Sequence, residues 1–505
     1  MVDIGDNIAN SLMLDSSALQ YLIAPVKTPT DSTKFSYFFD FKRGLMQLYN
    51  TIFWADGNNY FGFDNTDHLR LIIGGAAALT TTAQYRDPTA WIKGLLTYDA
   101  SASPKWNLIV GGVNVGTSNT ANILFNTAIA ERIGYLGSGA NYYDGYLALL
   151  GRADGQVLTA SSTGRQSADT GQWVNKNYTG TYGTNGFKLD FTNSGALGTD
   201  SSGNGNNWTP QGGITSVNQY TDTSTNNYCV LNPLRWYDGA GANGSVYSKG
   251  NLSVSRVVGA WSKHWGSLGV SSGKWYWEFQ ATTLNSPFTA TGIRNDITTL
   301  TANQFGTEAS EYGYLCNGQK GNNSVYSAYG TSYTGANVIG IGLDLDNGKI
   351  FFAKDNTWQN TGDPVAGTNP AYSGLSGTFF PAGTLDSDAV KYNFGARPFT
   401  YTPPTGFKAL NTANLPEGTA AAPATFNGNA AADGAYIAMN GTPETASCNG
   451  NAVTWGTHAD RVAGGMKLRT ASASYNASGS NTLSCTFLTP NRKSVQKYQT
   501  AKGNP

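Results

Sequence analysis

The chain has 505 residues, which is enough for two or three domains that each bury a core. Only 13% of its residues are charged and the formal net charge is zero, so composition offers no basic field for a polyanion and predicts no nucleic-acid partner. Glycine is abundant, at 62 residues, and aromatic residues reach 12%, which favours many short strands joined by tight turns over disorder. We therefore expect an all-β protein.

The first stretch, residues 1–30, is predicted to be an attachment segment. Its apolar residues favour one helix from Ile8 to Ile23, ending before Pro25. The alternative is a strand or helix that packs on the next domain. The stretch has no basic region ahead of an apolar core, so no secretory signal is expected, and no apolar run in the chain is long enough for membrane insertion.

A strand-rich block follows over residues 31–155. Its first strand places Phe35, Tyr37, Phe39 and Phe41 on one face and Ser36, Phe38 and Asp40 on the other. Three later pieces, residues 106–112, 132–137 and 142–148, resemble the second half of laminin-G/concanavalin-like sandwiches. In those, an apolar strand precedes an Ile-Gly strand and an Asp-Gly-Tyr-Leu return strand. Residues 156–186 are rich in Gly, Ser, Thr and Asn and predict a connector, which either docks across a surface or marks a domain boundary.

The next block, residues 187–412, contains the clearest strand signals. In residues 273–279, Trp275, Trp277 and Phe279 alternate with Lys274, Tyr276 and Glu278, which predicts a strand with one apolar face. In residues 338–352, Asn347-Gly348 separates two apolar runs. That dipeptide predicts a β-hairpin, because both residues tolerate positive φ.

Five patches of this block occur in the order seen in SPRY domains. They are residues 273–279, the hairpin 342–352, Phe379-Phe380-Pro381, Tyr392-Asn393-Phe394-Gly395 and Pro403-Pro404-Thr405-Gly406-Phe407. The resemblance implies a two-sheet antiparallel sandwich that serves as a binding module. The entry segments 189–191, 200–209 and 226–234 are similar to the SPRY-like region of bacteriophage tail proteins. The predicted architecture is thus two tandem antiparallel jelly-roll-type sandwiches, the first concanavalin-like and the second SPRY-like.

Beyond this block the composition changes. Residues 413–432 are small and mostly polar and predict a linker, and residues 433–505 predict a small β module with a basic tail. Cys448 and Cys485 lie in that module and can pair if the compartment allows; the alternative is that the four cysteines of the chain are reduced and mostly buried.

Few residues indicate chemistry. Asp344 and Asp346 have the opening spacing of a calcium loop, but the hairpin explains the same residues, and Asp200 lies in a loop of oxygen ligands that more often forms Asx-turns. We expect no cofactor, with calcium as the alternative. The only Gly-x-Ser-x-Gly precedes a strand instead of a helix, and no acid pair, metal cluster or phosphate loop is seen. No catalytic residue is predicted, and the chain is not expected to be an enzyme.

Aromatic residues in predicted loops are the better candidates for ligand contact, because flat rings suit sugars and amphipathic Tyr suits protein interfaces. The alternative is that they pack in the core or on sister subunits. The candidate ligand-binding residues are Trp236, Tyr237, Trp261, Trp265, Tyr326, Tyr329 and Trp358.

The resemblance implies a bacteriophage virion structural protein, tail-associated as a fibre or adaptor. It would bind other virion proteins and a host-surface glycan or protein, and it would be a homo-oligomer, with a trimer favoured. The expected location is the virion. The alternatives are a capsid decoration protein, a polysaccharide depolymerase and a cellular SPRY-type adaptor that binds peptides.

Overall fold

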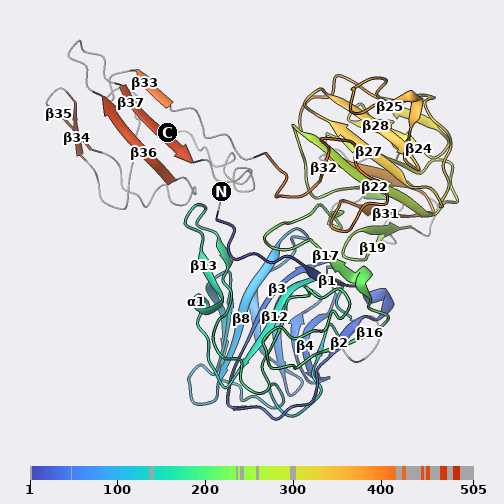
Figure 1. The fold of residues 1–505 in the computed structure, drawn as a ribbon. Helices are drawn as coiled ribbons and strands as arrows, with labels where there is room; N and C mark the ends of the chain where they lie inside the picture. Colours follow the sequence, from blue (N-terminus) through green and yellow to red (C-terminus); the bar gives the residue numbers. More distant parts are fainter. Residues whose placement is uncertain are drawn as a thin grey trace. The chain divides into compact units, whose positions relative to one another are not determined.

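The computed structural model describes residues 3–416, except 47, 136, 138–141, 235–236, 239–243, 257–260 and 296–302, and beyond them the backbone of five strands. Its contacts divide the chain into two compact units, Asp6–Arg165 with Asn175–Leu415, and Met1–Gly5 with Gln166–Val174 and Pro416–Pro505. The first of these units holds two β-sandwiches in succession (Figure 1). The all-β prediction is confirmed, and the strands pair almost entirely antiparallel.

The first sandwich packs two sheets, called sheet I and sheet II. Sheet I runs in the order β10 (Val113–Ser118), β9 (Trp106–Val110), β8 (Trp91–Asp99), β3 (Lys34–Arg43), β12 (Gly145–Asp154), β1 (Ser11–Leu14) and β17 (Gln219–Tyr220), and β15 (Phe187–Leu189) also pairs with β12. Sheet II runs β16 (Thr209–Gln211), β2 (Tyr21–Ile23), β11 (Arg132–Ile133), β4 (Asn50–Asp56), β5 (Asn59–Phe63), β6 (His68–Ile73) and β7 (Ala76–Gln84).

The second sandwich packs sheets III and IV. Sheet III runs β18 (Tyr237–Asp238), β21 (Ser262–Trp265), β30 (Phe380–Leu385), β23 (Ala290–Arg294), β24 (Glu311–Leu315), β25 (Gln319–Asn322) and β26 (Val325–Ala328). Sheet IV runs β19 (Val246–Ser248), β20 (Ser253–Ser255), β31 (Ala389–Asn393), β22 (Lys274–Thr283), β27 (Ile339–Asp344), β28 (Lys349–Lys354) and β29 (Thr357–Trp358), and β32 (Lys408–Ala409) pairs in parallel with β22.

The remaining elements are short. They are α1 (Ala160–Thr163), η1 (Ser16–Ala18), η2 (Ser216–Asn218), η3 (Gln359–Thr361) and the pair β13 (Gly164–Gln166) and β14 (Trp173–Asn175). In the other unit, β33 (Ala424–Asn427), β37 (Thr482–Leu488) and β36 (Lys467–Ser474) form one sheet, and β34 (Thr445–Cys448) pairs with β35 (Asn451–Thr454). Cys448 and Cys485 lie on these strands, but their side chains are outside the described residues, so their pairing stays a prediction.

The helix predicted from Ile8 to Ile23 is wrong. The segment forms β1 and β2, joined by η1, and β1 is buried on both sides between β12 and β17. Asp15 stops the strand, because its side chain accepts a hydrogen bond from the N–H of Ser17 and starts a 3₁₀ turn. Leu19 then takes a φ of 55°, which redirects the chain into β2.

Alternate side chains of β3, the first strand predicted from the sequence, pack on the two faces of sheet I. Tyr37, Phe39 and Phe41 of β3 lie in the core between sheets I and II. Phe38 points the other way, yet it is only 2% exposed, because Leu158, Tyr178 and Tyr182 cover it. Parts of the predicted connector therefore dock across the outer face of sheet I.

The hairpin prediction for residues 342–352 is confirmed, with a difference in its turn. β27 and β28 pair from Ile339↔Lys354 to Asp344↔Lys349, so four residues form the loop. Only Gly348 has positive φ, at 63°, while the Asp344 carboxylate accepts hydrogen bonds from both the backbone and the side chain of Asn347. Trp275, Trp277 and Phe279 of β22 face the core of this sandwich, as the period of two predicts.

Candidate functional site

The outer face of sheet IV carries a groove of about 250 Å³. Its floor is one cross-strand row, in which Ser253 of β20 lies opposite Lys391 of β31, and Lys391 lies opposite Gln280 of β22. The neighbours of Lys391 in sequence, Val390 and Tyr392, are buried in the core. Period-2 alternation therefore turns Lys391 outward into the groove.

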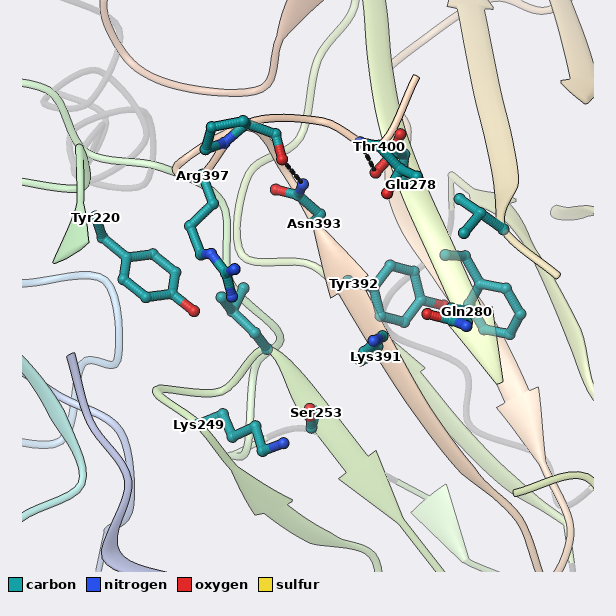
Figure 2. Close-up of a pocket in the computed structure, with 14 residues that line it drawn as sticks. Tyr220, Lys249, Ser253, Glu278, Gln280, Lys391, Tyr392, Asn393, Arg397 and Thr400 are labelled. Atoms are coloured by element: carbon teal, nitrogen blue, oxygen red, sulfur yellow. Dashed lines mark hydrogen bonds between the residues drawn. The ribbon is translucent and has the colours of Figure 1, made fainter. Parts of the chain in front are cut away.

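One wall of the groove is the loop after β31. Its backbone is held to the sheet by the Glu278 carboxylate, which accepts the N–H groups of Thr400 at 2.9 Å and Tyr401 at 2.8 Å. Asn393 fixes the same loop by donating from its side chain to the carbonyl oxygen of Pro398 at 3.0 Å (Figure 2). Glu278 is thus only 4% exposed and serves as an anchor for the loop.

The other wall is formed where the first sandwich meets the second. The N–H of Thr221 donates to the carbonyl oxygen of Ala396 at 2.8 Å, which brings Tyr220 of β17 to the groove. Lys249 also lines the groove, and its turn is held by the N–H of Gly250, which donates to the buried Asp144 carboxylate at 2.9 Å. Burial raises the pKa of Asp144 to about 7.

Three cations face this groove. Figure 2 shows Lys249, Lys391 and Arg397 around one space, and the Arg397 guanidinium carbon lies 5.6 Å from the centroid of the Tyr220 ring. Partial burial lowers the pKa of Lys391, and the nearby charges of Lys249 and Arg397 lower it further. None of the three forms an ion pair with a carboxylate in the part of the chain that the structure describes. The groove is therefore a locally positive site in a chain of zero net charge.

The aromatic residues predicted to bind a ligand do not gather in one place. Trp265 is 2% exposed and packs in a small cluster with Phe305, which half-buried Tyr326 also joins. Tyr329 is buried in the core of the second sandwich. Trp358 lies beside Phe351 at the end of sheet IV.

Trp261 is half-buried, and its ring centroid lies 5.2 Å from that of Phe288. Trp236 lies outside the described residues, and the structure describes only the backbone of Tyr237, which pairs with Lys263. A ligand-binding role for these residues stays a prediction, and the structure gives Trp265 and Tyr329 a packing role.

The three carboxylates considered for calcium hold local turns. Asp200 accepts hydrogen bonds from the backbones of Lys188, Ser202 and Asn206. Asp344 pairs with Lys274 at 3.0 Å, and Asp346 accepts the N–H of Gly273. Among the described residues, no group of three His, Cys, Asp or Glu side chains is arranged to hold a metal ion. Calcium stays an untested alternative.

Lys249, Lys391 and Arg397 were not among the site residues predicted from the sequence. Lys391 and Arg397 flank the Tyr392-Asn393-Phe394-Gly395 patch, which was used only to recognise the fold. The usable signal was the alternation around Tyr392, which places Lys391 outside the core. Lys249 carried no signal, because only the tertiary contact with Asp144 brings its turn to the groove.

Fold and sequence comparison define the class of this region. Residues 274–397 match the family model of the SPRY domain, and the presence of a SPRY domain is confirmed. The match runs from β22 to β31 through the strands of sheets III and IV between them, and it includes the start of the loop that walls the groove, as far as Arg397.

Three curated relatives share part of their sequence with the chain. It is 29% identical over 194 residues to ATP-dependent RNA helicase DDX1 of Xenopus laevis, covering 38% of this chain and 24% of that protein. It is 33% identical over 164 residues to ATP-dependent RNA helicase Ddx1 of Drosophila melanogaster, covering 32% of this chain and 21% of that protein. It is 26% identical over 147 residues to probable ATP-dependent RNA helicase ddx1 of Dictyostelium discoideum, covering 29% of this chain and 18% of that protein. The matches thus span about a quarter of these relatives or less.

Two solved structures are also similar over part of the chain. The SPRY domain of human HERC1 is 17% identical, with a TM-score of 0.26, covering 32% of this chain and 96% of that one. A human SPRY domain is 18% identical, with a TM-score of 0.23, and the match covers 29% of this chain and 94% of that one.

These relatives correct several predictions. A bacteriophage virion protein with virion partners, a host-surface receptor and a virion location is contradicted, because the curated relatives are named RNA helicases of three eukaryotes. The expectations of no nucleic-acid partner and of no enzyme are contradicted by the same names. Zero net charge is an average over the whole chain, so it gave no ground for excluding a nucleic-acid partner. No helix among the described residues is long and apolar enough to cross a membrane.

Proposed function

We propose that the second sandwich is a SPRY-type protein-interaction module and that the groove on sheet IV takes a segment of a protein partner. The observation that carries the proposal is the groove itself: Lys391 and Gln280 of its floor, and its loop wall as far as Arg397, lie within the residues that match the SPRY domain, while Ser253 and Thr400 complete the groove from outside that match. A shallow site lined by polar side chains and pinned loop backbone suits an extended peptide, which supplies its own hydrogen-bonding groups.

The groove is rigid enough to act as a preformed site. Its floor belongs to strands in the centre of sheet IV, and Glu278 and Asn393 fix the loop that forms its wall. Groups that are fixed before binding lose less conformational entropy when a partner arrives.

The test is a peptide-display selection against the full chain, followed by affinity measurements on the selected peptides. Ser253→Trp places a large ring on the groove floor, whereas Ser255→Trp places the same ring two residues further on the same strand and face, outside the groove lining. We expect Ser253→Trp to weaken binding by about tenfold or more and Ser255→Trp to leave it within about twofold. Peptides that bind both variants equally, or a selection without any binder, would refute the proposal.

RNA is included in the same measurements, because the curated relatives are RNA helicases by name. A single-stranded oligonucleotide that competes with the selected peptides would show that the groove is shared by both ligands. One that binds without competing would locate RNA binding at another surface.

A further inference from the structure

The charges around the groove are unbalanced. Lys249, Lys391 and Arg397 contribute three positive charges, and Glu278 is the only acidic residue among the described residues that line the groove. Both oxygens of Glu278 already accept backbone N–H groups, and one also accepts the hydroxyl of Tyr276. The Glu278 carboxylate is therefore held by the loop, and its single negative charge can balance at most one of the three cations.

The fold holds these like charges close together. Lys391 is fixed in register between Ser253 and Gln280, Lys249 sits at a turn with a φ of 54°, and the backbone of the Arg397 loop is bonded to the sheet. Partial burial disfavours the charged form of Lys391, and repulsion from Lys249 and Arg397 adds to that cost, which is why the pKa of Lys391 is lowered. Such an arrangement is stabilised when an anion binds among the cations.

The neighbouring polar groups suit the same kind of ligand. The floor of the groove carries the Ser253 hydroxyl, and its wall carries the Asn393 amide, which donates one hydrogen to Pro398 and has a second to offer to an oxygen atom of a ligand. The Gln280 amide nitrogen already donates to the backbone carbonyl oxygens of Gly335 and Ala336. The guanidinium of Arg397 can hold a carboxylate through two parallel N–H groups, a geometry that an ammonium group does not offer.

We propose that the groove recognises an acidic peptide segment, with clustered carboxylates of the partner bound among Lys249, Lys391 and Arg397. This inference rests on the proposed function, because it names the chemistry of the segment that the SPRY-type module takes. Carboxylate chemistry can come from Asp and Glu side chains or from a chain terminus, and a phosphorylated side chain presents a related anion.

Two features favour a peptide over single-stranded RNA. The three cations line one groove of about 250 Å³, whereas a nucleic-acid site follows the phosphate backbone over several nucleotides. Sites for single strands also offer free aromatic faces on which bases stack. Here Arg397 lies over the ring of Tyr220, and the other aromatic residues of the lining, Phe279 and Tyr392, are buried.

The experiment measures fluorescence anisotropy of labelled probes on the full chain. The probes are a Glu-rich octapeptide, the same peptide with every Glu replaced by Gln, its phosphoserine counterpart, and a poly-uridine oligonucleotide. We expect the Glu peptide to bind at least about tenfold more tightly than the Gln peptide, with an affinity that falls as salt is raised. Equal binding of the Glu and Gln peptides would overturn the inference, and so would tighter binding of the oligonucleotide that is lost in Lys391→Glu.

The variants are Lys391→Glu and a matched control, Lys408→Glu. Lys408 is an exposed lysine of β32 on the same sandwich, outside the groove lining. We expect Lys391→Glu to weaken binding of the Glu peptide by at least about tenfold, and Lys408→Glu to change it by less than about twofold. Comparison with the phosphoserine peptide shows which anion the groove prefers, and a loss that is equal in both variants would overturn the inference.

Failure of this inference is distinguishable from failure of the proposed function. If the module binds peptides at the groove but not through acidic groups, selected peptides will be blocked by Ser253→Trp and unaffected by Lys391→Glu. If the proposed function is wrong, Ser253→Trp will have no effect on any selected peptide.

Discussion

The outer faces of sheets I and IV show how two sandwiches of similar architecture come to differ in what they can bind. On sheet I, every outward side chain of β3 from Ser36 to Lys42 has a partner from later in the chain. Phe38 packs under Tyr178 and Tyr182, Asp40 accepts hydrogen bonds from Asn175 and Ser224, and Lys42 pairs with Asp222 at 2.6 Å. On sheet IV the loop after β31 covers Glu278 but leaves the row of Ser253, Lys391 and Gln280 open.

The contrast shows that a charged side chain on the outer face of a sheet can either hold the fold together or remain available to a ligand. Lys42 is buried and neutralised by Asp222, so it joins two parts of the chain, whereas Lys391 is exposed beside two other cations and has no carboxylate partner among the described residues. Burial and pairing make the first a structural residue, and their absence makes the second available to a ligand. The following predictions test whether the two faces differ in this way.

The largest effect is expected inside the first sandwich, at Arg152. Its guanidinium is buried, donates to the Glu131 carboxylate at 2.6 Å and to the Tyr37 hydroxyl at 3.0 Å, and bonds the Asn185 carbonyl oxygen. Arg152→Met leaves the Glu131 carboxylate buried without its cation, so we expect the free energy of unfolding to fall by about 3–5 kcal/mol. Urea unfolding followed by tryptophan fluorescence measures the change.

The control is the double variant Arg152→Met with Glu131→Gln, which removes both charges. It should recover part of the lost stability, because no unpaired charge then remains buried. A single variant as stable as the unmodified chain would contradict the view that the buried charges of this sandwich are structural.

The next effect concerns the covered face itself. Phe38→Ala removes a ring that is 2% exposed under the docked connector, and we expect it to lower the free energy of unfolding by about 3 kcal/mol. Limited proteolysis is a second readout, since residues 156–186 should become more accessible to cleavage. A variant with unchanged stability and unchanged cleavage would show that the connector does not dock on sheet I.

A pH dependence is expected from Asp144, which joins the two sandwiches. Burial raises its folded-state pKa to about 7 from an ordinary value of 3.8, so the folded state binds its proton more tightly than the unfolded state. Its contribution to stability is therefore fully present below about pH 4 and is lost as the pH rises through about 7.

Asp144→Asn removes this titration. Between pH 5 and pH 8, we expect the variant to gain about 2–3 kcal/mol in free energy of unfolding relative to the unmodified chain. Urea unfolding at a series of pH values gives the difference, and parallel curves for the two proteins would be inconsistent with a buried, titrating Asp144.

The smallest effect is expected on the open face. Lys391→Ala removes a solvated cation that lies near two like charges, so we expect the free energy of unfolding to change by less than about 0.5 kcal/mol. Destabilisation by several kcal/mol would mean that Lys391 is a structural residue like Lys42, and the comparison between the two faces would fail.

Much of the fold was predictable, because it rests on local patterns. Alternation identified β3 and β22, and Asn347-Gly348 identified the hairpin of β27 and β28. The helix assigned from Ile8 to Ile23 failed because apolar residues at mixed spacing fit either period, and the burial of β1 between β12 and β17 decided between them.

The candidate site was less predictable than the fold. Aromatic residues in predicted loops were favoured as ligand contacts, but Trp265 is buried on β21 and Tyr329 is buried against Tyr314 and Phe352 of the two sheets, which are distant in sequence and pack on it only after folding. The outward position of Lys391 could be predicted from the alternation along its strand. That Lys249, Lys391 and Arg397 line one groove could not be predicted, because their positions depend on a turn held by Asp144 and a loop held by Glu278, both far away in sequence.

Hydrogen-exchange mass spectrometry of the full chain, with and without the Glu-rich octapeptide, tests the central claim most directly. We expect the peptide to slow exchange in segments that contain residues 247–254 and 389–401, which form the floor and walls of the groove, and to leave β3 unchanged. Protection confined to other surfaces, with exchange of residues 389–401 unaltered, would contradict the account that the open face of sheet IV is the binding face.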